Sequence, residues 1–488
     1  MRLVTVIRQR PPAFWLAVIA CWFAFGQLVL LPLNYFISWD ESIYSSQFAG
    51  VVPHIAPSPH RAIGMPLILG PVTSFTAELP VLRGYVAVLT SLGVFLAFRA
   101  WVPVNAKVAQ IAAVLFATSA LALTNGHMLM PNLLTGLGTV AAMAYFVRTV
   151  EQDGWRSRSG LIAALGFMSL MRPTDAVFLA GVLGVGVLLA RRWRPRALST
   201  IGTMVAGLAI GGIAWTIASV IQFGGPIRRL TATSDTADVG HDPLAVQAFE
   251  AVWTQLTKAP VGTVATGLAY LAAAVVVVLV VRGVCNGWPE PKWLLTFAAA
   301  FLIILPYYVL LAYASARYHL PMAGLLTVVA AAALHKLATR WEGNTRTAVI
   351  GVCVLAVLQY AGAQWQEATR MGGAIHESRL ERARWAEVIA REGVQPPCRV
   401  AGHQAPAFAY TLRCHTGDNL VSLPNLTLWR NELQREWPKA QRSGATFVYI
   451  KSGFGEPKLV NGWRHIYLGQ ESGEPVYAYF PPGQGKEG

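Results

Sequence analysis

The sequence predicts an all-α membrane domain with about 11 transmembrane helices, followed by a small C-terminal α/β domain. The first reason is composition, since 54% of the 488 residues are hydrophobic and 13% are charged, whereas about 25% are charged in an ordinary soluble domain. The second is that the apolar residues come in blocks of about 18 to 25, long enough to cross a bilayer. The third is the hydrophilic stretch 364–488, which follows the last block.

The membrane domain is expected to comprise residues 1–363. Its first apolar block is expected to be a retained span, because it is longer than the apolar core of a signal peptide. A break at Met171–Asp175 separates a short fifth span from the sixth, since Pro173 cannot donate a backbone hydrogen bond. We predict spans at residues 13–36, 80–100, 105–124, 131–148, 159–171, 174–190, 199–222, 261–282, 293–313, 320–337 and 346–363.

Basic residues predict the orientation in the membrane. With a cytoplasmic N-terminus, the run Arg191–Arg196 and most other basic residues of the short loops fall on the inner side, as the positive-inside rule requires. An odd number of spans then places residues 364–488 outside the cytoplasm. The sequence thus predicts a multi-pass plasma-membrane protein. Its net charge of +15 follows from this topology, and no nucleic-acid partner is expected.

Residues 364–488 are predicted to form the extracytoplasmic α/β domain. Cys398 and Cys414 lie in this part and are a candidate disulfide if it is outside the cytoplasm. Periodicity and composition predict helices at residues 378–392 and 426–440, and strands at residues 399–402, 446–451, 465–468 and 476–480.

A charged pair, Asp40-Glu41, follows the first span directly. Charged residues beside a bilayer are costly unless they are paired or functional. Ser38 and Glu41 fit a capping box, with Ser38 as the N-cap of a helix, and this accounts for Glu41. The cap does not require Asp40, whose carboxylate would stay ionised near cations and act as a general base towards a hydroxyl. The two interpretations are compatible.

Three further groups have both a structural and a functional interpretation. The stretch Arg317–Pro321 is typical of interfacial anchoring, but its arginine also suits a phosphate clamp. Arg228-Arg229 are either solvated in a long outer loop or paired with an anionic lipid or substrate phosphate. Arg172 and Asp175 favour a local ion pair, at a break of the kind that often borders a cavity.

Four motifs, each present once, follow one another along about residues 13–340. An Asp-Glu-x-x-Tyr motif stands at Asp40–Tyr44, a Pro/Gly-rich stretch at His60–Leu67, an early arginine of span two at Arg83, and an Arg-Tyr-x-x-Pro entry to a late span at Arg317–Pro321. In this combination the chain resembles the GT-C superfamily of integral-membrane glycosyltransferases, which take a sugar from a polyprenyl phosphate. The similarity is to the dolichyl-phosphate-mannose mannosyltransferase-like and aminoarabinose-transferase-like branch.

The resemblance implies an inverting transfer from a polyprenyl-phosphate sugar to the hydroxyl of a glycan, lipid or protein acceptor at the outer face, among membrane lipids. Asp40 would take the proton of the acceptor, with Glu41 beside it in the catalytic motif. Cations placed in advance at a partly dry interface would stabilise the departing phosphate. The residues expected to bind that phosphate are Arg317, Tyr318, Arg228, Arg229, His60 and Arg61, and Tyr44, Arg83, Arg172 and Asp175 are expected to support them.

The chain departs from the family pattern at one point. Relatives often have an acidic residue near the start of span four, where this sequence reads Met130–Leu133. No group of His, Cys and Asp residues has the spacing of metal ligands, and no P-loop or dinucleotide fingerprint occurs. We therefore expect no cofactor and no metal site, but the sequence does not exclude a divalent metal ion.

The main alternative to a transferase is a transporter or lipid flippase. Transporters place charged residues and broken helices near the bilayer midplane, and they usually contain two repeated halves. This chain concentrates its charges at the outer interface and shows no such halves. A third hypothesis is a membrane-anchored scaffold that works through residues 364–488, but so many spans exceed what an anchor needs.

Overall fold

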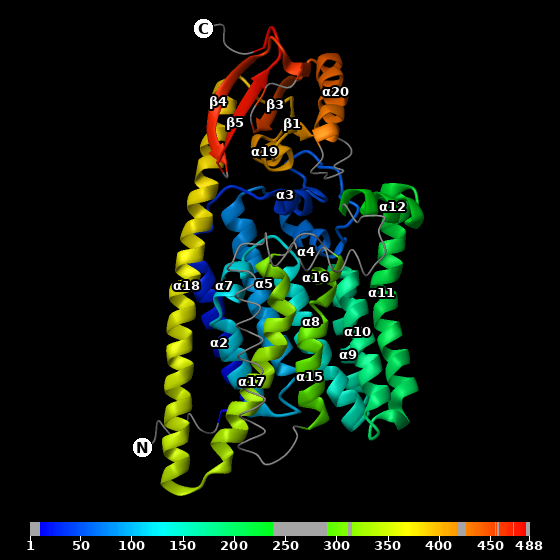
Figure 1. The fold of residues 1–488 in the computed structure, drawn as a ribbon, viewed down its shortest axis with the longest axis vertical. Helices are drawn as coiled ribbons and strands as arrows, with labels where there is room; N and C mark the ends of the chain where they lie inside the picture. Colours follow the sequence, from blue (N-terminus) through cyan, green and yellow to red (C-terminus); the bar gives the residue numbers. More distant parts are fainter. Residues whose placement is uncertain are drawn as a thin grey trace.

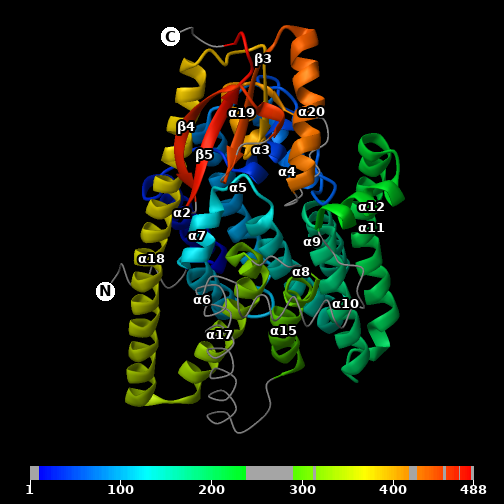
Figure 2. The ribbon, with the colours of Figure 1, turned by 45° about the horizontal axis from the view of Figure 1, so that its top comes forward.

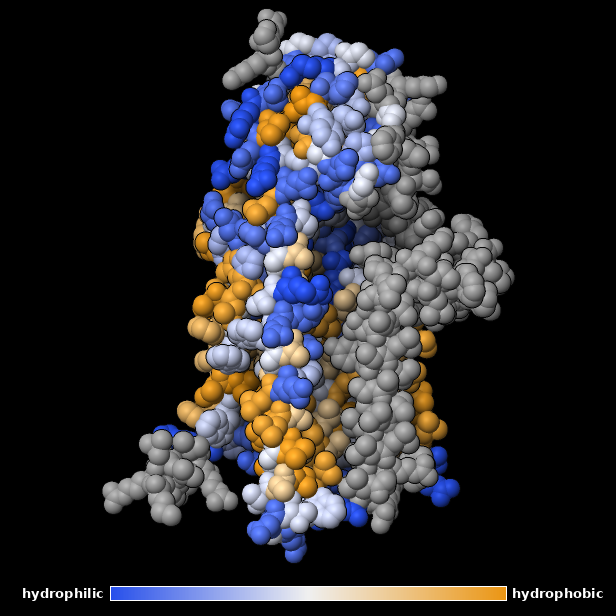
Figure 3. All heavy atoms as spheres, turned by 60° about the vertical axis from the view of Figure 1, so that its left-hand side comes forward, coloured by the Kyte–Doolittle hydropathy of each residue, from blue (hydrophilic) through white to orange (hydrophobic). Residues whose placement is uncertain are grey.

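The computed structural model describes residues 10–237, 290–310, 315–416 and 426–484, except 454, 456, 457 and 472. A bundle of long helices forms one part of the molecule, and a small sheet with its helices lies at one end of the bundle (Figure 1). Apolar side chains cover much of the helical part, while hydrophilic side chains predominate over the part that carries the sheet (Figure 3).

The helices of the bundle follow the predicted spans closely. Among the described residues, α2, α5, α8, α11, α17 and α18 (Gly343–Arg391) are long and apolar enough to cross a membrane, and the bent pair α6 and α7 makes a seventh. The bundle helices are α2 (Pro12–Val29), α5 (Leu79–Arg99), α6 (Ala106–Ala117), α7 (Ala120–Gly126), α8 (Asn132–Gln152), α9 (Trp155–Met171), α10 (Pro173–Leu189), α11 (Ala197–Phe223), α15 (Pro291–Leu302), α16 (Leu305–Leu310) and α17 (Leu320–Arg340).

The predicted number of about 11 spans is therefore not confirmed. The predicted span 261–282 lies outside the described residues. The fifth and sixth spans correspond to α9 and α10, which are 17 residues each and meet at Arg172, directly before Pro173. The predicted span 105–124 is bent by 69° between α6 and α7, where the side chain of Ser119 caps the second helix.

Two helix ends differ from the prediction. The first helix ends at Val29 instead of residue 36, because Pro32 disfavours the helical conformation of the residue before it. The predicted span 346–363 and the predicted helix 378–392 are parts of one helix, α18 (Gly343–Arg391) of 49 residues. The residues between them contain no proline that would end a helix. As a result, α18 runs the length of the bundle and reaches the sheet (Figure 1).

The C-terminal part is the small α/β unit that the sequence predicts. Its sheet has the order β2-β1-β3-β5-β4, in which β1 is parallel to β2 and β3, while β5 is antiparallel to β3 and β4. A short helix, α19, and a two-residue strand, β2, were not predicted. The elements are β1 (Cys398–Gly402), α19 (Ala405–Leu412), β2 (His415–Thr416), α20 (Leu426–Ser443), β3 (Thr446–Ser452), β4 (Arg464–Glu471) and β5 (Glu474–Phe480).

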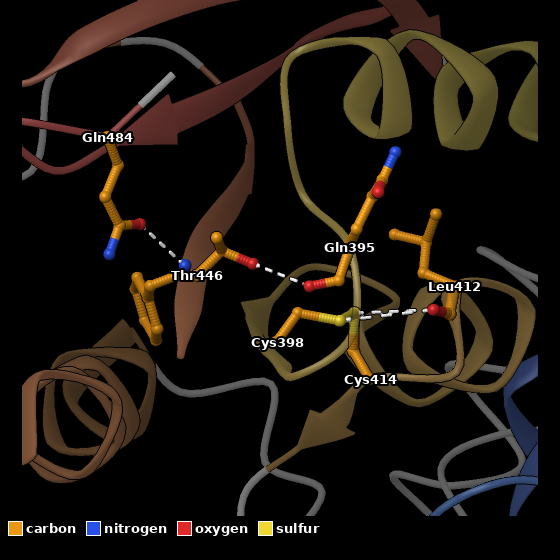
Figure 4. Close-up of a disulfide and its surroundings, with 7 residues drawn as sticks. Gln395, Cys398, Leu412, Cys414, Thr446 and Gln484 are labelled. Atoms are coloured by element: carbon orange, nitrogen blue, oxygen red, sulfur yellow. Dashed lines mark hydrogen bonds between the residues drawn. A yellow bond between two sulfur atoms is a disulfide. The ribbon is translucent and has the colours of Figure 1, made fainter. Parts of the chain in front are cut away.

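Cys398 and Cys414 are joined by a disulfide (Figure 4). The bond ties the start of β1 to the residue directly before β2, two residues after the end of α19. Nearby, the Thr446 hydroxyl donates to the Gln395 carbonyl at 3.1 Å, which links β3 to the segment before β1. The disulfide thus fixes α19 beside the sheet.

Short helices between the bundle and the sheet position the candidate site. They are α3 (Trp39–Ser46) and α4 (Gly64–Thr73) in the first loop, and α12 (Pro226–Ala237) after α11. A single hydrophobic core joins α3 and α4 to α19 and the sheet, and the rings of Phe36 and Phe408 lie 5.0 Å apart within it. The helix α3 therefore lies directly beneath the C-terminal part (Figure 2).

Candidate active site

The helix α3 starts with the capping box that the sequence predicts. The Ser38 side chain accepts a hydrogen bond from the Glu41 backbone N–H at 3.4 Å, and the Glu41 carboxylate accepts one from the Ser38 backbone N–H at 2.9 Å. Both acidic residues of the motif lie in the first turn, where the helix dipole favours negative charge. The cap fixes where α3 begins and thereby where Asp40 lies.

Asp40 lies between two arginines that come from different segments. Arg61, from the first loop, forms an ion pair with Oδ1 of Asp40, and the Nη2 atom of Arg317 lies 2.9 Å from its Oδ2 atom. The Asp40 side chain keeps 24% of its surface exposed. Burial would raise the pKa of the Asp40 carboxyl, but Arg61 and Arg317 outweigh burial and hold the pKa at about 2. Asp40 is therefore ionised and accessible.

Glu41 has a different environment, because it is fully buried. Its Oε2 atom lies 2.9 Å from Arg379 Nη1 and 3.5 Å from Arg83 Nη2, and its Oε1 atom accepts a hydrogen bond from the Leu129 backbone N–H at 3.2 Å. Burial would raise the pKa of Glu41, but Arg83 and Arg379 hold it well below its usual value. Glu41 thus joins α3 to α5, α18 and the segment before α8.

The paired arginines Arg228 and Arg229 point to different surroundings. Arg229 is buried, and it donates to the carbonyls of Pro59 and Arg61 at 2.8 and 2.7 Å and to the Ser219 hydroxyl at 3.2 Å. Burial lowers the pKa of its guanidinium to about 10, so it stays protonated at neutral pH. Arg228 is exposed. Arg229 therefore holds the backbone that carries Arg61, and Arg228 is not brought to Asp40.

A second cluster supports the segment that carries Arg317. The rings of Tyr307 and Tyr318 stack with centroids 4.7 Å apart, and the guanidinium of Arg172 lies about 5 Å from both. Arg172 also lies 3.8 Å from Asp175, which accepts a hydrogen bond from the Tyr307 hydroxyl. The predicted local pair of Arg172 and Asp175 is thus present. Arg172 also packs against Tyr318, which is the residue next to Arg317.

Two further predicted residues lie beside Arg61. The ring of Tyr44 is buried 5.9 Å from the Arg61 guanidinium, and burial raises the pKa of its hydroxyl to about 12. His60 is exposed and hydrogen-bonds the Ser58 hydroxyl at 3.2 Å. A cavity of about 70 Å³ is lined by Tyr44, Ser58 and Arg61 together with residues of α4 and α11. Arg61 thus both lines this cavity and pairs with Asp40.

Sequence reasoning missed two residues of this site, Arg379 and Tyr35. Arg379 lies 338 residues after Glu41, and a basic residue on an amphipathic helix gives no signal of such a contact. Tyr35 was included in the predicted first span, but its ring lies 3.5 Å from the Arg83 guanidinium.

Within the described parts of the chain, no group of three or more His, Cys, Asp or Glu side chains could hold a metal ion.

Comparison with solved structures identifies the fold. ArnT from Cupriavidus metallidurans bound to undecaprenyl phosphate is similar with a TM-score of 0.67 and 15% identity, over 97% of this chain and 99% of that chain. ArnT in the apo state gives a TM-score of 0.66 and 14% identity over 95% and 97%. The chain thus shares the fold of these two ArnT structures, which agrees with the resemblance predicted from the sequence.

Other comparisons add little. The arabinosyltransferase EmbB from Mycobacterium smegmatis matches with a TM-score of 0.40 and 11% identity, over 83% of this chain and 43% of that chain, which is too low for an argument about fold. No protein-family model matches the sequence, and no curated protein sequence matches it significantly.

Proposed function

We propose that this protein transfers a sugar from a polyprenyl-phosphate donor to an acceptor hydroxyl at the outer face of the plasma membrane. The proposal rests on Asp40, an accessible carboxylate held between the guanidinium groups of Arg61 and Arg317. An inverting transfer from a phosphate needs a base for the acceptor and cations for the leaving group. The donor class is supported by the fold, which is shared with a protein solved with undecaprenyl phosphate bound.

The proposed reaction is a single displacement. The acceptor hydroxyl oxygen attacks the anomeric carbon from the side opposite the phosphate, and its proton passes to the Asp40 carboxylate. The bond between the anomeric carbon and the phosphate oxygen breaks, and its electron pair leaves with the phosphate. The new glycosidic bond therefore has the inverted configuration. Arg61 and Arg317 stabilise the negative charge that grows on the departing phosphate.

The same arginines also control the strength of the base. With both guanidinium groups beside it, Asp40 has a pKa of about 2 and accepts a proton poorly. A bound donor phosphate competes for these groups, because arginine forms strong hydrogen bonds with phosphate oxygens. As Arg61 and Arg317 turn towards the phosphate, the pKa of Asp40 rises. Asp40 then becomes an effective base only when the donor is in place.

The other predicted residues have positioning roles in this proposal. The oxygens of Glu41 are already occupied by arginines and backbone N–H groups, so Glu41 holds α3 in place and takes no proton. Arg229 holds the Arg61 backbone, and Tyr318 packs between Arg172 and the segment of Arg317. In this proposal the donor phosphate is bound by Arg61 and Arg317, the two arginines that pair with Asp40, and the exposed Arg228 is given no role.

The orientation follows from the charge distribution. The basic residues of η1 (Arg194–Arg196) join α10 to α11 at the end of the bundle that lies away from the sheet (Figure 1). The positive-inside rule favours the cytoplasm for that end. Asp40 and the C-terminal part then lie on the outer side, where the C-terminal part is placed to select a glycan, lipid or protein acceptor.

Transfer from a panel of radiolabelled polyprenyl-phosphate sugars tests the function. Membranes that contain the full-length protein are compared with membranes that lack it, and the label is followed into acceptor fractions. We expect label to move from at least one donor, which would then identify the sugar. Movement of labelled lipid between leaflets, with no transfer from any donor, would contradict the proposal and support the flippase alternative.

A further inference from the structure

Arg379, on α18, contacts the helix that carries Asp40. Its Nη1 atom lies 2.9 Å from Oε2 of Glu41, and it also donates to the Phe36 carbonyl at 3.4 Å. The side chain of Arg379 is 12% exposed and that of Glu41 is 0% exposed. A residue from the C-terminal half of the chain thus holds the immediate neighbour of the proposed base.

Arg83, like Arg379, contacts the segment that leads from α2 into α3. Arg83, on α5, lies 3.5 Å from the same Glu41 oxygen and donates to the carbonyls of Leu33 and Tyr35 at 2.7 and 2.8 Å. The ring of Tyr35 lies 3.5 Å from the Arg83 guanidinium and 5.0 Å from that of Arg379. The chain that leads from α2 into α3 is therefore fixed from two sides, by α5 and by α18.

We infer that Arg379 is a positioning residue for the transfer, which couples α18 to the geometry of Asp40. This inference rests on the proposed function. A buried carboxylate that loses one of its cations is left with uncompensated charge, and the surrounding structure must adjust. Glu41 and Asp40 are adjacent in the first turn of α3, so any adjustment of Glu41 moves Asp40. A displacement of about 1 Å at a reacting group can reduce the rate about 100-fold.

Three variants of α18 separate this role from a general effect on the helix. Arg379→Gln removes the charge, Arg379→Lys keeps the charge without the planar fork, and Arg370→Gln removes an exposed arginine whose ion pair is with Glu367 on the same helix. We expect Arg379→Gln to lower kcat about 10- to 100-fold with the donor KM nearly unchanged. Arg379→Lys should recover part of the rate, and Arg370→Gln should match the wild type.

A double variant tests whether Arg379 acts through its contact with Glu41. If both residues act through one contact, the double variant Glu41→Gln, Arg379→Gln should transfer no more slowly than the slower single variant, because residues in contact are not additive. Effects on kcat that multiply would show that the two residues act separately. A wild-type kcat for Arg379→Gln would overturn the inference outright.

Hydrogen exchange of the backbone amides tests the coupling without any activity. In Arg379→Gln, the amides of α3 (Trp39–Ser46) should exchange faster, while those of α5 and α8 keep their protection. This result in a protein that transfers sugar from no donor would remove the proposed function but keep the link between α18 and α3. Normal exchange in α3 alongside normal transfer would overturn the inference alone. Loss of folding in both Arg379 variants would also overturn it, because the role would then be purely structural.

Discussion

Asp40 and Arg317 form an ion pair of 2.9 Å although 277 residues separate them along the chain. The pair joins the first loop to the short turn that leads into α17, and Arg61 completes it from the other side. The proposed base is therefore paired with both proposed phosphate ligands in the absence of donor. In the proposed mechanism, a bound donor phosphate occupies the two cations and thereby releases the carboxylate.

Replacement of Arg317 should lower the kcat of transfer more than it weakens binding of the donor. Arg317→Gln removes a cation that stabilises the leaving phosphate, so we expect kcat to fall about 10²- to 10³-fold. Arg317→Lys should retain more of the rate, because it restores the charge but not the bidentate fork. Steady-state transfer with the purified protein measures both effects. A rise in KM with an unchanged kcat would show that Arg317 binds the donor without assisting the reaction.

The pH dependence of kcat/KM should reflect the low pKa of Asp40. A lowered pKa means that the Asp40 ion pairs are complete above the usual value of 3.8 and are lost only as the pH falls towards about 2. Ionisation of Asp40 should therefore cause no acid limb in the wild type between about pH 4 and about pH 8. Arg61→Gln removes one cation, raises the pKa of Asp40 and should shift its acid limb to higher pH. An identical profile for both proteins would contradict the assignment.

The adjacent residues Arg228 and Arg229 provide a matched pair for stability. Arg229→Gln breaks hydrogen bonds to the carbonyls of Pro59 and Arg61, so we expect it to lower the free energy of unfolding by about 2 kcal/mol. Arg228→Gln changes an exposed side chain and should stay within about 0.5 kcal/mol of the wild type. Thermal denaturation in detergent compares the two. Equal loss of stability in both variants would argue against the role given to Arg229.

The disulfide should stabilise the C-terminal part. Cys398 and Cys414 are 16 residues apart, and closing a loop of this length contributes about 3 kcal/mol. We expect the double variant Cys398→Ser, Cys414→Ser to have a lower Tm than the wild type. A reducing agent should lower the Tm of the wild type and leave that of the double variant unchanged. Equal Tm values under oxidising conditions would show that the bond is absent or without effect.

Much of the helical fold follows from the sequence because apolar length and proline placement are local signals. The break before Pro173 and the N-cap of α3 at Ser38 both lie where the sequence predicts them. The predicted end of the first helix is wrong because the apolar sequence continues past Val29, whereas Pro32 disfavours a helical conformation of the residue before it. The continuity of α18 was missed because its composition changes from apolar to charged while its helical geometry does not change.

The candidate site was predictable where a motif names the residue. Asp40 and Arg317 belong to separate sequence motifs, and their side chains are in contact in the structure. The same reasoning could not separate Arg228 from Arg229, because adjacent residues of one helix point in different directions and only the fold determines which is buried. Arg379 carries no local signal, since its partner Glu41 is brought to it by the packing of α18 against the first loop.

The most direct test of the account is the rate of sugar transfer by Asp40→Asn with the donor that the wild type uses. The substitution keeps the size of the side chain and removes the base. Asp153→Asn is the matched control, because Asp153 forms ion pairs with Arg158 and Arg196 at the other end of the bundle. We predict that Asp40→Asn folds and transfers at least about 10²-fold more slowly, while Asp153→Asn transfers normally. A folded Asp40→Asn protein with the wild-type rate would contradict the central claim.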